Sequence, residues 1–168
     1  MRYMKIVKMK KYLLLLCVCA GFAFSSCRKI VVSPFDAARQ AVIDDQAIQA
    51  YFSLNQITNV TKDPSGLYYH IDTLGTGAHP TSSSNVVVNY TTYTLDDAQV
   101  ESQPSYYFQL SAIDVEAYRI GLPLIGVGGT VTLYVPSGLA FGSTGSPDGK
   151  IGPNTCLIYH FKLQGFSN

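Results

Sequence analysis

The sequence predicts an α+β domain in which an antiparallel sheet of about five strands is covered by one short helix, with a helical extension in front of it. Three observations support this class. Residues 35–52 have the spacing of an amphipathic helix, and residues 66–168 form short β-rich runs separated by Gly, Pro, Asn and Asp. Between the third and fourth of these runs, residues 114–120 are long enough for only a short helix.

Residues 1–26 have the layout of a secretory signal peptide. Five basic residues come first, and the apolar run from Leu13 to Phe24 follows. This run is too short for a spanning helix, which needs roughly 20 apolar residues. We therefore expect residues 1–26 to be removed on export.

The end of the signal region resembles a bacterial lipobox, because Ser25 and Ser26 stand directly before Cys27, although Phe24 replaces the usual Leu. We expect lipidation at Cys27, a tether over 27–34 and, because no Asp follows the cysteine, sorting to the outer membrane of a bacterial cell envelope, facing the periplasm. Two acyl chains would anchor the protein where one is marginal. Ordinary signal cleavage, giving a soluble secreted protein, is the alternative.

The charge of the mature chain argues against nucleic acid as a partner. Residues 1–26 hold five of the 12 Lys and Arg and none of the 11 Asp and Glu, so the remainder has seven basic and 11 acidic residues, a net charge of −4. A mildly acidic chain without a basic patch has no electrostatic footprint for nucleic acid. Protein or peptide partners are favoured.

The first predicted element after the tether is the helix over 35–52, which together with its linker occupies residues 35–65. Its apolar stripe is expected to comprise Ala38, Ala41, Ile48 and Phe52, with Asp44, Asp45 and Gln49 on the other, solvated side. Adjacent carboxylates on a helix point roughly 100° apart, so Asp44 and Asp45 are not expected to form an acid–base pair. The helix could dimerise, pack on its own domain or space the domain from the membrane.

The strands are expected in the β-rich part of the chain, at 67–74, 86–95, 106–110, 130–135 and 155–163. The last has the clearest alternation, with Leu157, Tyr159 and Phe161 on one face and Ile158 and His160 on the other. Cys156 begins this run and is expected to be a small buried hydrophobe.

Several motifs in residues 66–168 resemble, in order and spacing, the landmarks of FKBP-type peptidyl-prolyl cis-trans isomerases. They are Val-Val-Asn-Tyr-Thr at 87–91, Gly-Leu at 121–122, Val-Gly at 127–128, Leu-Tyr-Val-Pro-Ser-Gly-Leu-Ala-Phe-Gly at 133–142, Ile-Gly-Pro-Asn-Thr at 151–155 and Leu-Ile-Tyr-His-Phe-Lys-Leu at 157–163. The N-terminal helix followed by Pro-Ser-Gly-Leu-Tyr-Tyr at 64–69 is similar to the extension of envelope lipoproteins of this family.

The resemblance implies an FKBP-like fold, a strongly twisted sheet wrapped around the short helix, with an apolar pocket between them. It also implies isomerisation of X-Pro bonds in exported proteins. The barrier to rotation about an amide is about 20 kcal/mol, and an apolar cavity shaped to the twisted, less polar amide favours the transition state. Such a mechanism needs no nucleophile, metal or cofactor.

Carried over residue by residue, the resemblance places nine residues in the pocket: Tyr90, Val100, Glu101, Tyr106, Val115, Tyr118, Phe141, Ile151 and Tyr159. Phe108 competes with Tyr106 for one wall, and Val115 would offer its backbone N–H to a substrate carbonyl. Each can also be read as an ordinary core residue, and for Tyr90, Phe108 and Tyr159 taken alone this is the better interpretation.

The pocket departs from the family pattern at four positions. The family usually has Phe-Asp where this chain has Val100-Glu101, Trp at Tyr118 and Tyr at Phe141. In addition to these four, Gly152 replaces the first proline of the flap. A lost hydroxyl of the kind missing at Phe141 is worth about 0.5–1.5 kcal/mol. The alternative function is therefore a catalytically weak or inactive module that binds peptides or proteins in the same groove at the outer membrane.

Overall fold

The computed structural model describes residues 34–168, so the predicted signal peptide, Cys27 and nearly all of the tether lie outside the described residues. Helix α2 (Pro34–Leu54) comes first. Six strands follow: β1 (Thr61–Lys62), β2 (Tyr68–Thr73), β3 (Asn85–Thr94), β4 (Gln99–Gln109), β5 (Thr130–Val135) and β6 (Leu157–Ser167). The described chain therefore has the expected α+β composition.

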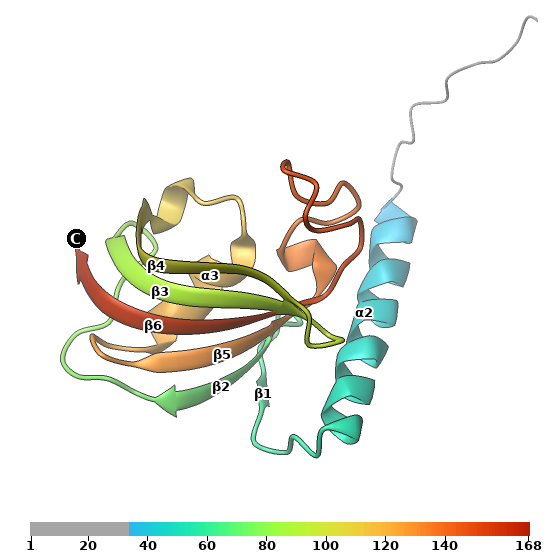
Figure 1. The fold of residues 1–168 in the computed structure, drawn as a ribbon, viewed down its shortest axis with the longest axis horizontal. Coiled ribbons are helices and arrows are strands. Elements are labelled where there is room, and N and C mark those ends of the chain that lie inside the picture. Colours follow the sequence, from blue (N-terminus) through green and yellow to red (C-terminus); the bar gives the residue numbers. More distant parts are fainter. Residues whose placement is uncertain (1–33) are drawn as a thin grey trace, which may run out of the picture. The chain divides into compact units, whose positions relative to one another are not determined.

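The six strands form one antiparallel sheet in the order β1-β2-β5-β6-β3-β4, which curves visibly in Figure 1. The long strands β3 and β6 pair over ten positions, from Asn85–Ser167 to Thr94–Leu157. Their inward residues Val86, Val88 and Tyr90 are buried, as period-2 alternation requires.

The short helix α3 (Glu116–Gly121) packs on the inner face of this sheet and is followed by a 3₁₀ turn, η3 (Leu122–Leu124). The approach is close, because a Cβ on Gly121 would lie 2.4 Å from a methyl carbon of Leu133 in β5. Inward residues of β3, β5 and β6 and the α3 region form the main core. This arrangement agrees with the predicted short helix, which begins two residues later than expected.

Helix α2 packs against the opposite face of the sheet. Ile48 and Phe52 contact a second apolar cluster that includes Tyr68, Tyr134 and Ile158 from β2, β5 and β6. These three residues alternate with inward-facing neighbours, so one sheet has an apolar surface on both sides. Of the three roles left open for the helix, packing on its own domain is the one observed; Figure 1 shows α2 beside the sheet.

The expected faces of α2 were partly wrong. Ile48 and Phe52 are buried as predicted, but Ala38 and Ala41 are exposed, and Asp44 is only 2% exposed. Asp44 stands four residues before Ile48 and eight before Phe52, so it lies on the same face of the helix as these two. The carboxylate is buried because it has hydrogen-bond partners in the domain.

Three strands differ from the prediction, one of them β6, which runs to Ser167 rather than ending at 163. Strand β4 begins at Gln99 rather than at 106, because an edge strand tolerates polar residues and Pro104, whose missing N–H interrupts no ladder in the sheet interior. At Ser105 the backbone φ is +51°, and its N–H bonds Asn89 Oδ1 at 2.9 Å, where the β3–β4 register shifts. The two-residue strand β1 was not predicted, because it has no alternation to detect.

A smaller expectation concerns Cys156. Cys156 is buried and forms no disulfide with any residue in the described range 34–168, which confirms the expected small buried residue, and burial raises the pKa of its thiol to about 12. Within residues 34–168, none of the helices combines the length and the apolar character needed to cross a bilayer.

Candidate active site

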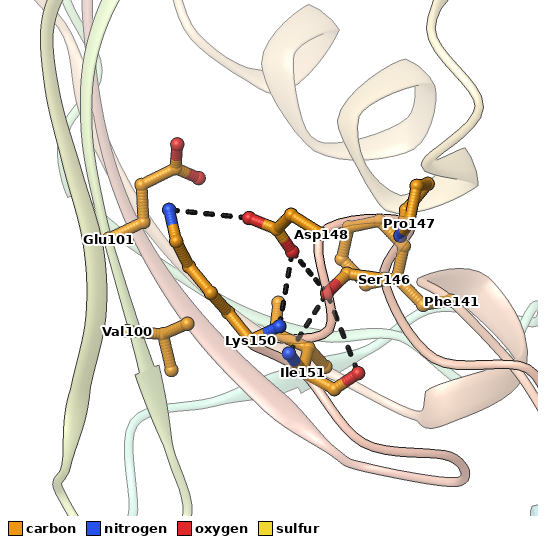
Figure 2. Close-up of a pocket in the computed structure, with 8 residues that line it drawn as sticks. All are labelled: Val100, Glu101, Phe141, Ser146, Pro147, Asp148, Lys150 and Ile151. Atoms are coloured by element: carbon orange, nitrogen blue, oxygen red, sulfur yellow. Dashed lines mark hydrogen bonds and ion pairs between the residues drawn. The ribbon is translucent and has the colours of Figure 1, made fainter.

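A cavity of about 210 Å³ opens between the edge strand β4 and the loop that precedes β6. Figure 2 shows its lining side chains, which come from two segments far apart in the sequence. They are Val100 and Glu101 from β4, and Phe141, Ser146, Pro147, Asp148, Lys150 and Ile151 from the loop. The cavity is smaller than the roughly 300–1,000 Å³ of drug-sized ligand sites, so its size suits a single side chain.

The walls of this cavity are largely apolar. Val100, Phe141 and Ile151 all pack against the main core, and Ile151 is buried. Phe141 follows the 3₁₀ turn η4 (Ser137–Leu139), which leads out of β5. Aliphatic and aromatic groups on opposite sides of a small cleft can hold an apolar ring such as that of proline.

The loop over residues 146–151 is held in shape by its own polar groups. Ser146 Oγ donates to Asp148 Oδ1 at 2.6 Å and accepts from the N–H of Ile151 at 2.9 Å, while the N–H of Lys150 donates to Asp148 Oδ1 at 3.1 Å. The Ser146 hydroxyl, with the Lys150 amide, lowers the pKa of Asp148 to about 2. The carboxylate therefore stays charged at any physiological pH.

Lys150 brings a positive charge to the mouth of the cavity. Its Nζ lies 3.2 Å from Asp148 Oδ2, and Figure 2 shows the side chain extended past Val100 towards the Glu101 carboxylate. Both members of the Lys150–Asp148 pair are more than half exposed, so the pair adds little to stability. It does place a cation beside any peptide that enters the cleft.

Gly145 lets this loop approach its own other end. Its φ is +75°, and a Cβ there would lie 2.5 Å from the carbonyl oxygen of Ile151. Both the left-handed backbone and the lack of space require glycine at this position.

Glu101 is connected to the interior by Tyr90 of β3. The Tyr90 hydroxyl donates to Glu101 Oε2 at 2.9 Å, and Gln103 Nε2 donates to Oε1 at 3.1 Å. Burial, with a contribution from the Glu101 carboxylate, raises the pKa of Tyr90 far above its ordinary value. The phenol therefore remains a donor that fixes the carboxylate at the rim.

Tyr90 belongs to a cluster of aromatic rings from three strands, β3, β4 and β6, and from α3. Tyr118 lies 5.0 Å from Tyr159 and 4.8 Å from Phe161 between ring centroids, both in edge-to-face geometry. Such contacts are worth about 0.5–1.5 kcal/mol each beyond burial. Burial and the neighbouring Tyr159 raise the pKa of Tyr118. The cluster is a rigid neutral support between the sheet and α3.

Of the nine expected pocket residues, four line the cavity: Val100, Glu101, Phe141 and Ile151. Tyr90 joins them through its hydrogen bond to Glu101. The other four do not line this cavity, and are Tyr106, Val115, Tyr118 and Tyr159.

The four that do not line it lie in or beside the aromatic cluster. Tyr118 and Tyr159 are 5% and 1% exposed, so little of either ring is open to a ligand. Tyr106 packs edge-on against Tyr90 and is 37% exposed, whereas Phe108 is buried against Tyr118. Val115 is buried at the start of α3, where its carbonyl accepts the N–H of Tyr118.

The lining residues that the sequence did not indicate are Ser146, Pro147, Asp148 and Lys150. They stand in a segment that reads only as a loop, so no periodicity places them. The run Ser-Pro-Asp-Gly at 146–149 does predict a tight turn, because Asp side chains bond backbone N–H groups two residues on. Over residues 34–168, no three His, Cys, Asp or Glu side chains gather as metal ligands.

Comparison with known proteins identifies what the chain resembles. A sequence model of the FKBP-type peptidyl-prolyl cis-trans isomerases matches residues 77–164. A probable FKBP-type peptidyl-prolyl cis-trans isomerase FkpA of Neisseria meningitidis serogroup B is 36% identical over 103 residues, covering 59% of this chain and 37% of that protein. The outer membrane protein MIP of Legionella longbeachae is 38% identical over 104 residues, covering 60% and 44%. The chain thus spans less than half the length of these relatives.

The fold has solved counterparts too. The crystal structure of FkpA from Escherichia coli superposes with a TM-score of 0.66 at 25% identity, covering 79% of this chain and 64% of that one. The curved antiparallel sheet with its short helix is thus the FKBP-like fold that the sequence motifs predicted.

Proposed function

Because the chain belongs to the FKBP-type peptidyl-prolyl cis-trans isomerase family, we propose that it catalyses cis-trans isomerisation of X-Pro bonds and acts as a folding helper. The observation that carries this proposal is the cleft with Val100, Phe141 and Ile151 in its walls. These residues are among those for which the resemblance to the family predicts contact with the proline ring.

The chemistry follows from the apolar lining. The planar amide is stabilised by resonance, which opposes rotation with a barrier of about 18–20 kcal/mol. Rotation removes the resonance and makes the C–N bond less polar, so a water-poor cleft favours the twisted amide over the hydrated planar one. No covalent step and no cofactor are needed.

The named residues have distinct roles in this proposal. The side chains of Val100, Phe141 and Ile151 hold the proline ring, and Glu101, fixed by Tyr90, sets the polarity at the rim. Val115 would present its backbone N–H to a substrate carbonyl. Tyr118 and Tyr159 support the cleft from below.

A second candidate is a weak or inactive module that binds proline-containing segments in the same cleft. Two observations favour it. Tyr118 and Tyr159 are almost fully buried, so the cleft lacks an aromatic floor open to a ligand. Phe141 also has no hydroxyl to donate to a bound peptide, which removes about 0.5–1.5 kcal/mol of binding.

Isomerisation of a proline-containing tetrapeptide distinguishes the two candidates. For the active isomerase, we expect turnover above the uncatalysed rate, a loss of roughly tenfold or more in kcat/KM in Phe141→Ala, and no change in Tyr107→Ala, whose ring is exposed on β4. If the unmodified chain shows no turnover but the variants Phe141→Tyr and Tyr118→Trp do, the chain is the binding module. If the unmodified chain neither turns over nor binds the peptide, both candidate functions are excluded.

The location of the protein forms a further part of the proposal. The signal-like residues 1–26 and the lipobox-like Ser-Ser-Cys at 25–27 support a lipoprotein anchored through Cys27 in the outer membrane and facing the periplasm, with exported proteins as substrates. The name of the Legionella longbeachae relative, an outer membrane protein, supports the same location. Radiolabelled fatty acid should enter the unmodified chain and not Cys27→Ser; equal labelling of both would disprove the anchor.

A further inference from the structure

The most unusual buried group outside the cleft is the carboxylate of Asp44 on α2. It is 2% exposed, and its three hydrogen-bond donors are all neutral: Gln40 Nε2 at 2.7 Å, and the N–H and Oγ of Ser137 at 2.8 and 2.6 Å. A buried carboxylate is costly unless such donors compensate for the lost water. Two of the three bonds therefore tie α2 to the first residue of η4.

Ser137 also holds the turn that carries Phe141. Its carbonyl oxygen accepts the N–H of Ala140 at 3.0 Å and the N–H of Gly142 at 2.8 Å. Phe141 lies between these two donors. Asp44 accepts hydrogen bonds from the N–H and the hydroxyl of Ser137, and the Ser137 carbonyl accepts hydrogen bonds from both neighbours of Phe141. Ser137 thus connects α2 to one wall of the cleft.

The same chain of bonds reaches the second wall. The carbonyl of Gly142 accepts the N–H of Asn154 at 2.7 Å, three residues after Ile151. Both Gly142 and Asn154 have left-handed backbone, with φ of +55° and +52°. Glycine adopts this conformation without strain, whereas at Asn154 it has a modest steric cost that the surrounding contacts must offset. The two walls formed by Phe141 and Ile151 are thus joined to each other and, through Ser137, to Asp44.

We propose that Asp44 is a positioning residue for the peptide cleft: from the opposite face of the sheet, it fixes Ser137 and so sets the separation of Phe141 and Ile151. The part that concerns substrate turnover rests on the proposed isomerase function; the geometric link does not. The N-terminal helix is then a component of the site and does more than connect the domain to the envelope.

The test uses Asp44→Asn and Ser137→Ala in the full chain. Asn keeps the size of the side chain but removes the charge, and Ala at 137 removes one bond and keeps the backbone N–H. Hydrogen exchange of the Gly142 and Asn154 amides, resolved by NMR, reports on the link directly. We expect exchange at both to accelerate roughly tenfold in Asp44→Asn and less in Ser137→Ala, with the double variant no faster than Asp44→Asn alone.

Two references separate positioning from general stability. The N–H of Gly126 bonds Leu74 at the other end of the domain and should be unaffected. Asp45→Asn, at the adjacent carboxylate that pairs with Lys62 and Tyr68 instead, should leave Gly142 and Asn154 unchanged relative to Gly126. The proposal is overturned if hydrogen exchange in Asp44→Asn accelerates equally at Gly142, Asn154 and Gly126. It is also overturned if exchange at Gly142 and Asn154 accelerates in neither Asp44→Asn nor Ser137→Ala although both variants fold. If Asp44→Asn does not fold, Ser137→Ala decides alone.

Catalysis supplies the second readout. In Asp44→Asn we expect kcat/KM for a proline tetrapeptide to fall roughly tenfold, and Asp45→Asn to retain the full value. A tenfold loss without any change at Gly142 would also contradict positioning through Ser137. If the unmodified chain has no turnover, the isomerase function fails, while the exchange data still decide the link between α2 and the cleft.

Discussion

Phe52 attaches the N-terminal helix to the sheet, and its removal should destabilise the whole domain. The ring packs edge-on against Tyr68, with centroids 5.2 Å apart, and against Tyr134 at 4.8 Å. Burial of a Phe side chain is worth about 1.5–3 kcal/mol, and each aromatic contact adds about 0.5–1.5 kcal/mol. Since measured Phe→Ala losses in cores are about 3–5 kcal/mol, we expect Phe52→Ala to lower the free energy of unfolding by about 3 kcal/mol.

Urea denaturation followed by circular dichroism and tyrosine fluorescence measures this loss, since the chain contains 12 Tyr and no Trp. A loss of 3 kcal/mol corresponds to a Tm about 10 °C lower for a domain of this size. Phe52→Leu, which keeps the apolar volume but loses both ring contacts, should cost about 1–2 kcal/mol. The cost of Phe52→Leu therefore gives the contribution of the aromatic contacts, and the difference between the two variants gives that of the apolar volume.

Leu54→Ala on the same helix is the matched control. Its side chain is 82% exposed, so the change should stay within about 0.5 kcal/mol. If Phe52→Ala costs no more than this control with an unchanged m-value, α2 is not docked on the sheet and the reasoning is refuted. A helix that melts before the sheet would instead give separate transitions by the two probes.

Two further predictions concern single polar groups. The Thr92 hydroxyl is fully buried and has no hydrogen-bond partner among the described residues, so Thr92→Val should raise the free energy of unfolding by about 1 kcal/mol; a lower denaturation midpoint would reveal an unseen partner. The pKa of Asp148 lies below its ordinary 3.8, at about 2, so its contribution to loop order is complete above pH 3.8 and is lost as pH falls through about 2. An NMR titration of the Asp148 carboxyl should give this midpoint, and Ser146→Ala should move it upward; an unmoved midpoint would contradict the assigned cause.

The parts of the fold that were predictable have a local periodic signal. In β6, Leu157, Tyr159 and Phe161 alternate with Ile158 and His160, and the structure places the first three in the main core. Burial of Ile158 on the other face was not predictable from this alternation. It depends on α2, which packs there from about a hundred residues earlier in the chain.

Signals that were weak or overlooked explain the remaining differences. The first half of β4 was missed because an edge strand need not alternate and tolerates Pro104. Asp44 could have been placed correctly, since its spacing from Ile48 and Phe52 is that of one helix face; its charge argued wrongly for solvent. Asp148 and Lys150 could not be placed, because only the tertiary path of their loop brings them opposite Val100.

The cleft therefore depends on two kinds of structure with different sensitivity to substitution. Val100 belongs to β4, whose pairing with β3 extends over many residues, and it stands at the irregularity between the pairs Tyr93–Gln99 and Thr92–Glu101. Phe141 and Ile151 belong to a loop placed by a few polar groups, among them Ser137, Asp44 and Ser146. Changes in this second group can alter the shape of the cleft while the sheet and its core remain folded.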